Sequence, residues 1–145
     1  MVTVGESAAE TIHATCVAIG GRGVLIEGPS GSGKSDLALR LIDRGATLVS
    51  DDYTEVSAHG ASAFATSPPT IAGKIEVRGL GIVTMPHLDT VVLALVVRLT
   101  RDVMRMPEAQ SCRIAGVDIP YLELAAHEAS APLKVELALT GRVMK

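Results

Sequence analysis

The stretch Gly28-Pro-Ser-Gly-Ser-Gly-Lys-Ser35 fits the pattern Gly-x-x-x-x-Gly-Lys-Ser/Thr without a mismatch. Loops of this pattern bind phosphate, because the glycines let successive backbone N–H groups turn inward and the following helix adds the positive end of its dipole. The lysine, here Lys34, reaches the β and γ phosphates, and the hydroxyl of Ser35 is a ligand for Mg²⁺. The predicted nucleotide site consists of Gly28, Pro29, Ser30, Gly31, Ser32, Gly33, Lys34 and Ser35.

The residues on both sides of this phosphate loop predict the strand and the helix that such a loop requires. Before it, Thr15–Ile19 and Val24–Ile26 flank the turn Gly20-Gly-Arg-Gly23, which is typical of a hairpin. After it, Asp36–Arg44 consists of helix formers, and Gly45 is placed to cap the carboxyl end of the helix. A flexible Gly/Ser linker, the alternative, would not lie between an apolar strand and an amphipathic helix.

Two adjacent acids, Asp51 and Asp52, follow the short apolar strand predicted over Thr47–Ser50. Beside a phosphate loop, one carboxylate can hold Mg²⁺ directly or through water, while the other accepts a proton from an attacking hydroxyl. Neighbouring residues on an extended chain point in opposite directions, so we expect the two acids to have different tasks. An Asp-Asp turn that caps the next segment is the alternative, and the nearby phosphate loop favours a functional role.

A second pair of charged residues, Glu76 and Arg78, alternates with apolar residues within Ile71–Val83, ahead of the bend Gly79-Leu-Gly81. On a strand the two would share one face, where they suit a metal contact and a phosphate contact. A surface ion pair on an edge strand would have the same spacing, so the spacing leaves both interpretations open. The preceding Ala- and Ser-rich stretch Ser57–Thr70 predicts weakly patterned strand and loop.

Length and composition restrict the class of protein. With 145 residues, 48% of them apolar, the chain suffices for one buried core, so we expect one domain over residues 1–145 with a flexible N-terminus over residues 1–11. A net charge of −3 provides no basic field for polyanions, so we expect no nucleic-acid partner. The longest apolar run, Val91–Val97, is far below the roughly 20 residues of a membrane span, so we expect no membrane contact. No secretory signal is recognisable, which favours the cytoplasm, and Cys16 and Cys112 are expected to be buried thiols.

Three segments, taken in order along the chain, resemble the catalytic domain of one known family. They are His13 ahead of the phosphate loop across a strand pair, Val49-Ser-Asp-Asp52 after the helix, and Ile75-Glu-Val-Arg-Gly-Leu-Gly-Ile82. The family is HPr kinase/phosphorylase, which phosphorylates a serine of the phosphocarrier protein HPr, and the third segment is similar to its signature. A weaker likeness continues through Val91–Arg98 and Ile114–Pro120 to the C-terminus.

The resemblance implies roles for the residues of the nucleotide site. Lys34 would bind the phosphates of ATP, and Ser35 and Glu76 would hold Mg²⁺. His13 would lie in the active site, although a histidine at the start of a strand is otherwise an ordinary surface residue.

The resemblance also implies the catalytic groups. The aspartate pair would supply the proton acceptor, and we favour Asp52 for this role with Asp51 assisting. Arg78 belongs to the catalytic signature. A further family arginine is matched most closely by Arg105, across a shortened loop.

The chain departs from longer family members at two places. It begins almost at His13 and thus resembles short forms that consist of the kinase domain alone, without the additional N-terminal domain and its regulation. The stretch Ala125–Pro132 has neither the Gly nor the Arg of a family loop tied to phosphate-dependent removal of phosphoserine. It offers the imidazole of His127 beside the carboxylate of Glu128 instead, so we expect phosphorylase activity to be weak or absent.

These observations predict an α/β phosphate-loop domain of the HPr kinase and phosphoenolpyruvate carboxykinase-like type. Val91–Arg98 would be a core strand, because it is apolar on both faces, and Leu133–Val143 a helix docked on the sheet. The expected function is ATP- and Mg²⁺-dependent serine phosphorylation of an HPr-like phosphocarrier protein, in regulation of the phosphotransferase system. A small-metabolite kinase with the same loop and a nucleotide sensor without transfer activity are the alternatives, and two retained acids argue against the sensor. Members of this family form symmetric assemblies, so the resemblance is compatible with a homo-oligomer of this chain.

Overall fold

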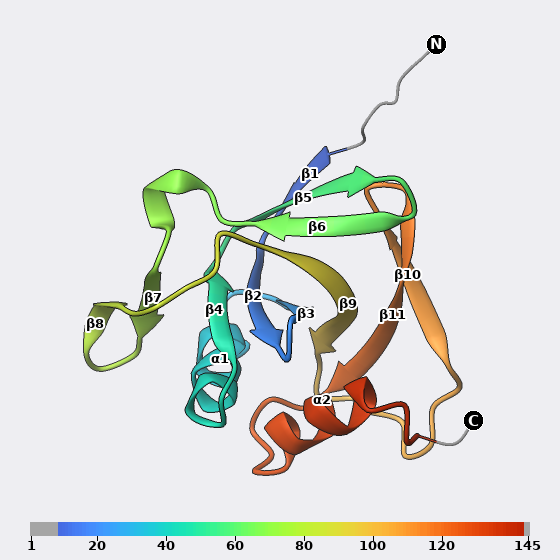
Figure 1. The fold of residues 1–145 in the computed structure, drawn as a ribbon. Coiled ribbons are helices and arrows are strands. Elements are labelled where there is room, and N and C mark those ends of the chain that lie inside the picture. Colours follow the sequence, from blue (N-terminus) through green and yellow to red (C-terminus); the bar gives the residue numbers. More distant parts are fainter. Residues whose placement is uncertain (1–8, 144–145) are drawn as a thin grey trace.

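A nine-stranded sheet lies at the centre of residues 9–143, the part of the chain that the computed structural model describes (Figure 1). The strands are β1 (Ala9–Ile12), β2 (Ala14–Ile19), β3 (Arg22–Glu27), β4 (Thr47–Ser50), β5 (Thr54–His59), β6 (Ser62–Thr66), β7 (Lys74–Val77), β8 (Gly81–Thr84), β9 (Thr90–Leu99), β10 (Gln110–Ile114) and β11 (Val117–Leu124). The helices are α1 (Lys34–Asp43), the short 3-10 helix η1 (Pro69–Ile71) and α2 (Ala131–Leu139). Strands β7 and β8 form a separate hairpin that projects from the sheet (Figure 1).

The long strand β9 organises the sheet, whose order is β1-β5-β6-β9-β3-β2-β4. Along one side it pairs in parallel with β3, and along the other it pairs first with β6 and then, from Val96 to Leu99, in parallel with β11. Strands that are paired in parallel are typically covered on both faces. The predicted hairpin of β2 and β3 is confirmed, and its turn residues Gly20 and Gly21 have the positive φ angles that such a turn requires.

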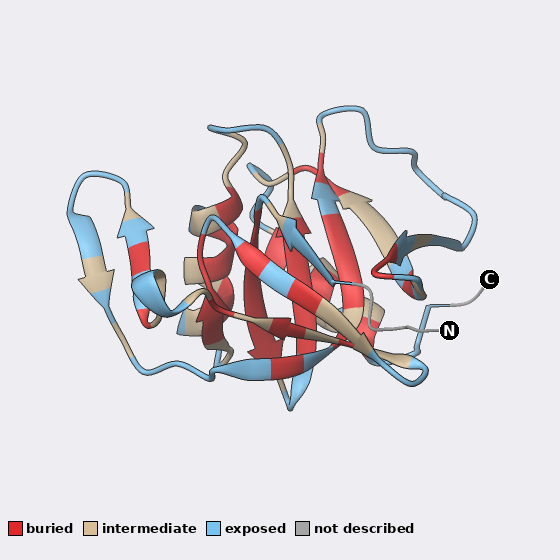
Figure 2. Ribbon diagram, turned by 90° about the horizontal axis from the view of Figure 1, so that it is seen from above, coloured by how far each residue is buried: buried red, intermediate tan, exposed pale blue. Residues whose placement is uncertain are grey.

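The core consists of two clusters of buried side chains, one on each face of the sheet. Buried residues are concentrated in the central strands and in α1 (Figure 2). On β9, Leu95 and Val97 belong to the cluster that packs against α1 and α2, whereas Val91 and Val96 belong to the other cluster. The prediction that Val91–Arg98 is a core strand with two apolar faces is therefore confirmed.

Helix α1 follows the phosphate loop directly and lies against the sheet. It begins at Lys34, two residues before the predicted start, and ends at Asp43. Gly45 has a φ of 112° and donates its backbone N–H to the carbonyl of Ile42, so the predicted glycine cap is confirmed. Leu37 and Leu41 are completely buried and attach the helix to the sheet.

Helix α2 extends over Ala131–Leu139, whereas the sequence predicted a helix over Leu133–Val143. It begins earlier because Pro132 is accepted in the first turn, where its missing N–H is not needed. It ends just before Gly141, which has a φ of 74°. Within residues 9–143, neither helix is long and apolar enough to cross a membrane.

Three further predictions differ from the structure. The Ser57–Thr70 stretch contains most of a regular hairpin, β5 and β6, in which Ala63 and Ala65 are buried although alanine is a weak strand former. Residues 9–11, predicted as part of a flexible N-terminus, belong to β1 and pair with β5, while residues 1–8 lie outside the described part.

Cys16 is buried as expected, whereas Cys112 is only half-buried. Burial raises the pKa of both thiols.

Replacing Leu41 by alanine is expected to lower the free energy of unfolding by roughly 2–5 kcal/mol, since a fully buried leucine leaves a cavity between α1 and the sheet. The matched change Leu137→Ala, on the exposed face of α2, should cost less than about 0.5 kcal/mol. Urea unfolding of the two variants and the parent protein measures the difference. Equal losses would mean that α1 does not contribute to the core as described.

Candidate active site

A cavity of about 490 Å³ opens between the phosphate loop, helix α1, the β7–β8 hairpin and the loop from β11 to α2. Its walls are polar over much of their extent. The lining residues are His13, Ser30, Gly31, Ser32, Gly33, Lys34, Ser35, Asp36, Leu39, Asp52, Glu76, Val77, Arg78, Ala126 and His127.

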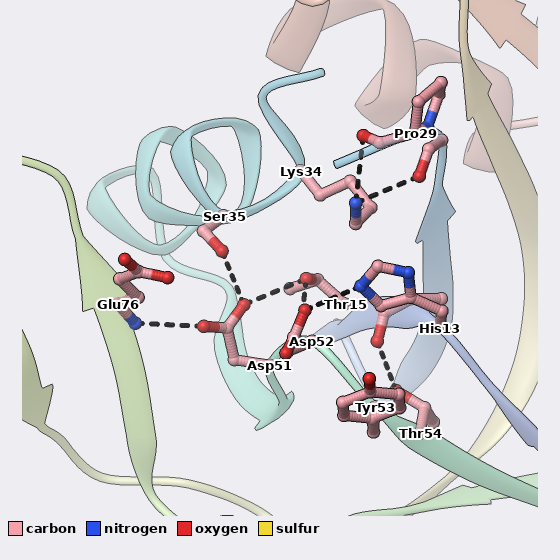
Figure 3. Close-up of polar contacts among 12 residues, drawn as sticks. His13, Thr15, Pro29, Lys34, Ser35, Asp51, Asp52, Tyr53, Thr54 and Glu76 are labelled. Atoms are coloured by element: carbon pink, nitrogen blue, oxygen red, sulfur yellow. Dashed lines mark hydrogen bonds and ion pairs between the residues drawn. The ribbon is translucent and has the colours of Figure 1, made fainter. Parts of the chain in front are cut away.

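Lys34, near the end of the phosphate loop, is held by two backbone carbonyls at the start of the same loop. Lys34 is the first residue of α1, and its Nζ donates to the backbone carbonyls of Gly28 at 3.0 Å and Pro29 at 3.2 Å (Figure 3). An ammonium has three N–H donors, so one remains for an anion. Gly31 and Gly33 have φ angles of 79° and 99°, which only glycine adopts without strain, and they give the loop its curvature.

The hydroxyl of Ser32 is buried in the wall of the same loop. Among the described residues its Oγ has no hydrogen-bond partner. A buried hydroxyl without a hydrogen-bond partner lowers the stability of the fold, unless a bound group accepts a hydrogen bond from it. The oxygen of a phosphate would satisfy this donor, which agrees with the backbone geometry of the loop.

Asp51 is buried beneath the cavity and connects three segments of the fold (Figure 3). Its Oδ1 accepts hydrogen bonds from the hydroxyls of Ser35 at 2.6 Å and Thr15 at 2.9 Å. Its Oδ2 accepts the backbone N–H of Glu76 at 2.9 Å. The carboxylate thus fixes the end of the phosphate loop, strand β2 and strand β7 relative to one another.

Asp52 points the other way, into the cavity, as predicted for two adjacent acids. Its φ of 71° lies in the left-handed region, which aspartate adopts more readily than most residues. The backbone N–H of Asp52 donates to the Thr15 hydroxyl at 3.3 Å, which helps to hold this turn. Its Oδ1 lies 2.8 Å from Nε2 of His13, whose ring stacks on Tyr53 with 5.1 Å between ring centroids.

Glu76 and Arg78 both line the cavity, from the end of β7 and the turn that follows it. Ile75, which precedes Glu76 on β7, is buried in the core and fixes β7 against α1. Within residues 9–143 the two charged side chains form no ion pair with each other, so both are free to face a ligand. Of the two interpretations that their spacing left open, their position in the cavity wall favours the functional one.

The structure brings most of the predicted site residues together, and Arg105 is the exception. His13, Lys34, Ser35, Asp52, Glu76 and Arg78 line the cavity, and Asp51 lies directly beneath it. Gly28 and Pro29 lie behind the wall and hold Lys34. Arg105 is exposed in the loop between β9 and β10 and is not part of the lining.

Sequence reasoning assigned no role in the site to Thr15, Leu39 or Ala126. Thr15 is a polar residue inside the apolar strand β2, and this pattern in the sequence could have indicated a buried hydrogen bond. In the structure Thr15 is fully buried and donates to Asp51. Leu39 and Ala126 carry no chemical signal in the sequence. His127 was noted for its imidazole, and the structure places it in the cavity wall.

Comparisons with known proteins agree with this geometry. The family model described as HPr Serine kinase C-terminal domain matches residues 6–131. Among curated relatives, the HPr kinase/phosphorylase of Clostridium beijerinckii is 36% identical over 78% of this chain and 38% of its own length, and that of Xylella fastidiosa is 34% identical over 79% and 42%. The solved structure of the Hpr(Ser) kinase/phosphatase from Coxiella burnetii matches with a TM-score of 0.80 and 27% identity, over 90% of this chain and 94% of that chain.

The matches extend through both halves of the cavity, from His13 and the phosphate loop to the loop before α2. The chain spans about two-fifths of the length of these two curated relatives. Since the family model covers far more than half of the chain, and the structural match covers nine-tenths of it, the chain belongs to the family of HPr serine kinase C-terminal domains.

Proposed function

We propose that this domain transfers the γ-phosphoryl group of ATP to a serine hydroxyl of an HPr-like phosphocarrier protein, as part of phosphotransferase-system regulation. The observation that carries the proposal is the exposed carboxylate of Asp52, held by His13 in the wall of the phosphate-loop cavity. A domain that only bound nucleotide would not need a positioned proton acceptor. Membership of the HPr kinase family supports a protein serine as the acceptor.

The nucleotide would bind with its phosphates on the loop Gly28–Ser35. The backbone N–H groups, the free donor of Lys34 and the unpartnered hydroxyl of Ser32 all offer hydrogens to anionic oxygens. Arg78, from the opposite wall, adds a second fixed positive charge for the phosphoryl group in transit.

The residues around Ser35 fit Mg²⁺. They offer only oxygen donors, namely the Ser35 hydroxyl, the Asp51 carboxylate beneath it and the Glu76 carboxylate across the cavity. Mg²⁺ is typically held by one or two protein carboxylates together with substrate phosphates. When bound, the ion would neutralise charge that develops on the phosphate oxygens.

Asp52 would act as the general base. As the serine Oγ forms its bond to the γ phosphorus, the bond from that phosphorus to the bridging oxygen breaks, and ADP leaves. The serine proton passes to the Asp52 carboxylate. His13 holds this carboxylate in place at 2.8 Å, and Asp51, whose two oxygens already accept three donors, fixes the surrounding backbone.

The direct test incubates the protein with γ-labelled ATP, Mg²⁺ and a purified HPr-like protein, followed by mass spectrometry of the acceptor. We expect the label on one serine and none after that serine is replaced by alanine. Label in a small molecule from a cell extract would favour the metabolite kinase instead. Nucleotide binding without any transfer would favour the sensor, and either result would contradict the proposal.

We also expect the reverse reaction to be slow. Attack of inorganic phosphate on phosphoserine, which yields serine and pyrophosphate, brings two anions together and needs additional positive charge. The loop from β11 to α2 contributes Ala126 and His127 to the cavity wall and no arginine. Loss of one such donor typically costs about 10² in rate, so pyrophosphate release near neutral pH should be slower than the forward reaction by about this factor.

Pyrophosphate release is followed with a coupled assay on serine-phosphorylated HPr-like protein with Mg²⁺ and excess phosphate. The forward rate, measured on the same preparation, is the reference. Comparable rates in the two directions would show that an arginine in this loop is dispensable.

A further inference from the structure

The loop between β11 and α2 carries His127 into the wall of the cavity. The loop packs directly on the phosphate loop, because a Cβ added to Gly33 would lie 3.2 Å from Cβ of Ala126. His127 is exposed toward the cavity, and across residues 9–143 no hydrogen bond to its imidazole is formed. A solvent-facing imidazole thus lies beside the loop that would hold the nucleotide phosphates.

The backbone around His127 is fixed from helix α1. Arg40 donates through Nη2 to the carbonyl of Ala126 and through Nη1 to that of Glu128, at 3.2 Å, so it holds the residue on each side of His127. The guanidinium is itself oriented by Asp36, whose Oδ2 lies 3.1 Å from Nε. A helix that begins in the phosphate loop therefore also sets the position of the imidazole.

The carboxylate next to His127 in sequence is engaged elsewhere. Oε1 of Glu128 lies 2.6 Å from Nζ of Lys134, and this contact lowers the pKa of Glu128. The charged or titratable groups in the cavity wall and in the contacts that hold this loop are His13, Lys34, Asp36, Arg40, Asp52, Glu76, Arg78, Glu128 and Lys134. Asp36, Glu128 and Asp52 already have cationic or imidazole partners, and Glu76 is the carboxylate proposed to hold Mg²⁺, so the imidazole is available to an anionic ligand.

We propose that His127, in its imidazolium form, donates a hydrogen bond to the phosphate chain of the bound nucleotide and so makes nucleotide affinity depend on pH. This inference rests on the proposed nucleotide binding. Imidazole is the side chain that changes its charge in the physiological range. A cation beside a polyphosphate strengthens binding, and deprotonation turns the same side chain into a neutral one.

The sign of the effect follows from this charge change. With the imidazole protonated, the contact is charge-assisted and affinity is high. When rising pH removes the proton, the positive charge is lost and affinity falls. Since His127 is exposed, the contact is worth about as much as a good surface ion pair, which corresponds to a change in dissociation constant of about three- to tenfold.

The test measures the dissociation constant of ATP by isothermal titration calorimetry, at about pH 6 and at about pH 8.5. Excess Mg²⁺ keeps the charge of the nucleotide itself nearly constant. We expect the affinity of the parent protein to fall with rising pH, His127→Gln to bind weakly at both values, and His127→Lys to bind tightly at both. His59→Gln, at the exposed end of β5, is the matched control and should behave as the parent protein.

Adenosine, which lacks phosphates, should bind equally to all variants at both pH values. An affinity of His127→Gln with the same value and pH dependence as in the parent protein would overturn the inference while leaving the proposed function intact. Absence of ATP binding by the parent protein would overturn both. Circular dichroism of each variant verifies that the fold is retained.

Discussion

Asp52→Asn is expected to slow phosphoryl transfer by about 10² to 10⁴, the usual contribution of a general base, with little change in nucleotide affinity. The asparagine side chain has nearly the same shape and can still accept a hydrogen bond from His13. It cannot take a proton from an attacking serine hydroxyl. Single-turnover transfer from labelled ATP measures the chemical step, and ATP titration measures affinity separately.

The neighbouring variant Asp51→Asn provides the contrast, because the two acids have different surroundings. Asp51 is buried, and its two oxygens accept three hydrogen bonds. In asparagine one of these oxygens is replaced by an NH₂ group, which would face at least one other donor and could not accept its hydrogen bond. An unsatisfied buried donor costs about 1–3 kcal/mol, so this variant should lose stability. A folded Asp51→Asn protein with the larger loss of transfer rate, beside a nearly normal Asp52→Asn protein, would reverse the two roles.

The different roles of the two acids could be predicted from the sequence in part. Alternation along an extended chain indicated that Asp51 and Asp52 would face opposite ways, and they do. The chain achieves this with a turn, in which Asp52 has a positive φ, rather than with an extended strand. The buried partners of Asp51 come from β2, α1 and β7, so only the tertiary structure brings them together.

Local patterns were most informative where backbone geometry and chemistry depend on the same few residues. The phosphate loop, the glycine cap of α1 and the β2–β3 hairpin were predicted because glycine is required at defined φ angles. The β5–β6 hairpin was predicted only weakly, since its buried positions are filled by alanines that carry little strand signal. Packing against β9, which is distant in sequence, stabilises it.

Two residues mark the limit of sequence reasoning about the site. Arg105 was assigned on a resemblance across a loop of altered length, and it lies in an exposed segment and is not among the residues that line the cavity. His127 has no local pattern that connects it to the phosphate loop, because the connection is made by Arg40 reaching from α1 to the backbone before α2. Long-range hydrogen bonds of this kind are not visible as a spacing along one chain.

The second large effect is expected for Lys34→Ala, which should reduce kcat/KM for ATP by at least about 10³. This loss exceeds the usual cost of one lost hydrogen-bond donor, because both a donor and a full positive charge disappear. Nζ of Lys34 is the one ammonium in the phosphate loop, and it is held by the carbonyls of Gly28 and Pro29. Without it, the fixed positive charge that would offset the β and γ phosphates is lost.

The fold should survive this change, since the shortened side chain leaves room for water to reach the two carbonyls that Lys34 releases. Lys74→Ala is the matched control, because Lys74 is an exposed lysine on β7 whose Nζ contacts only the carbonyl of Thr70, at 3.4 Å, among the described residues. Thermal unfolding and ATP titration of both variants separate stability from binding. If Lys34→Ala is folded and retains the turnover of Lys74→Ala, the phosphates do not bind where the loop geometry indicates, and the assignment of the cavity as a nucleotide site is wrong.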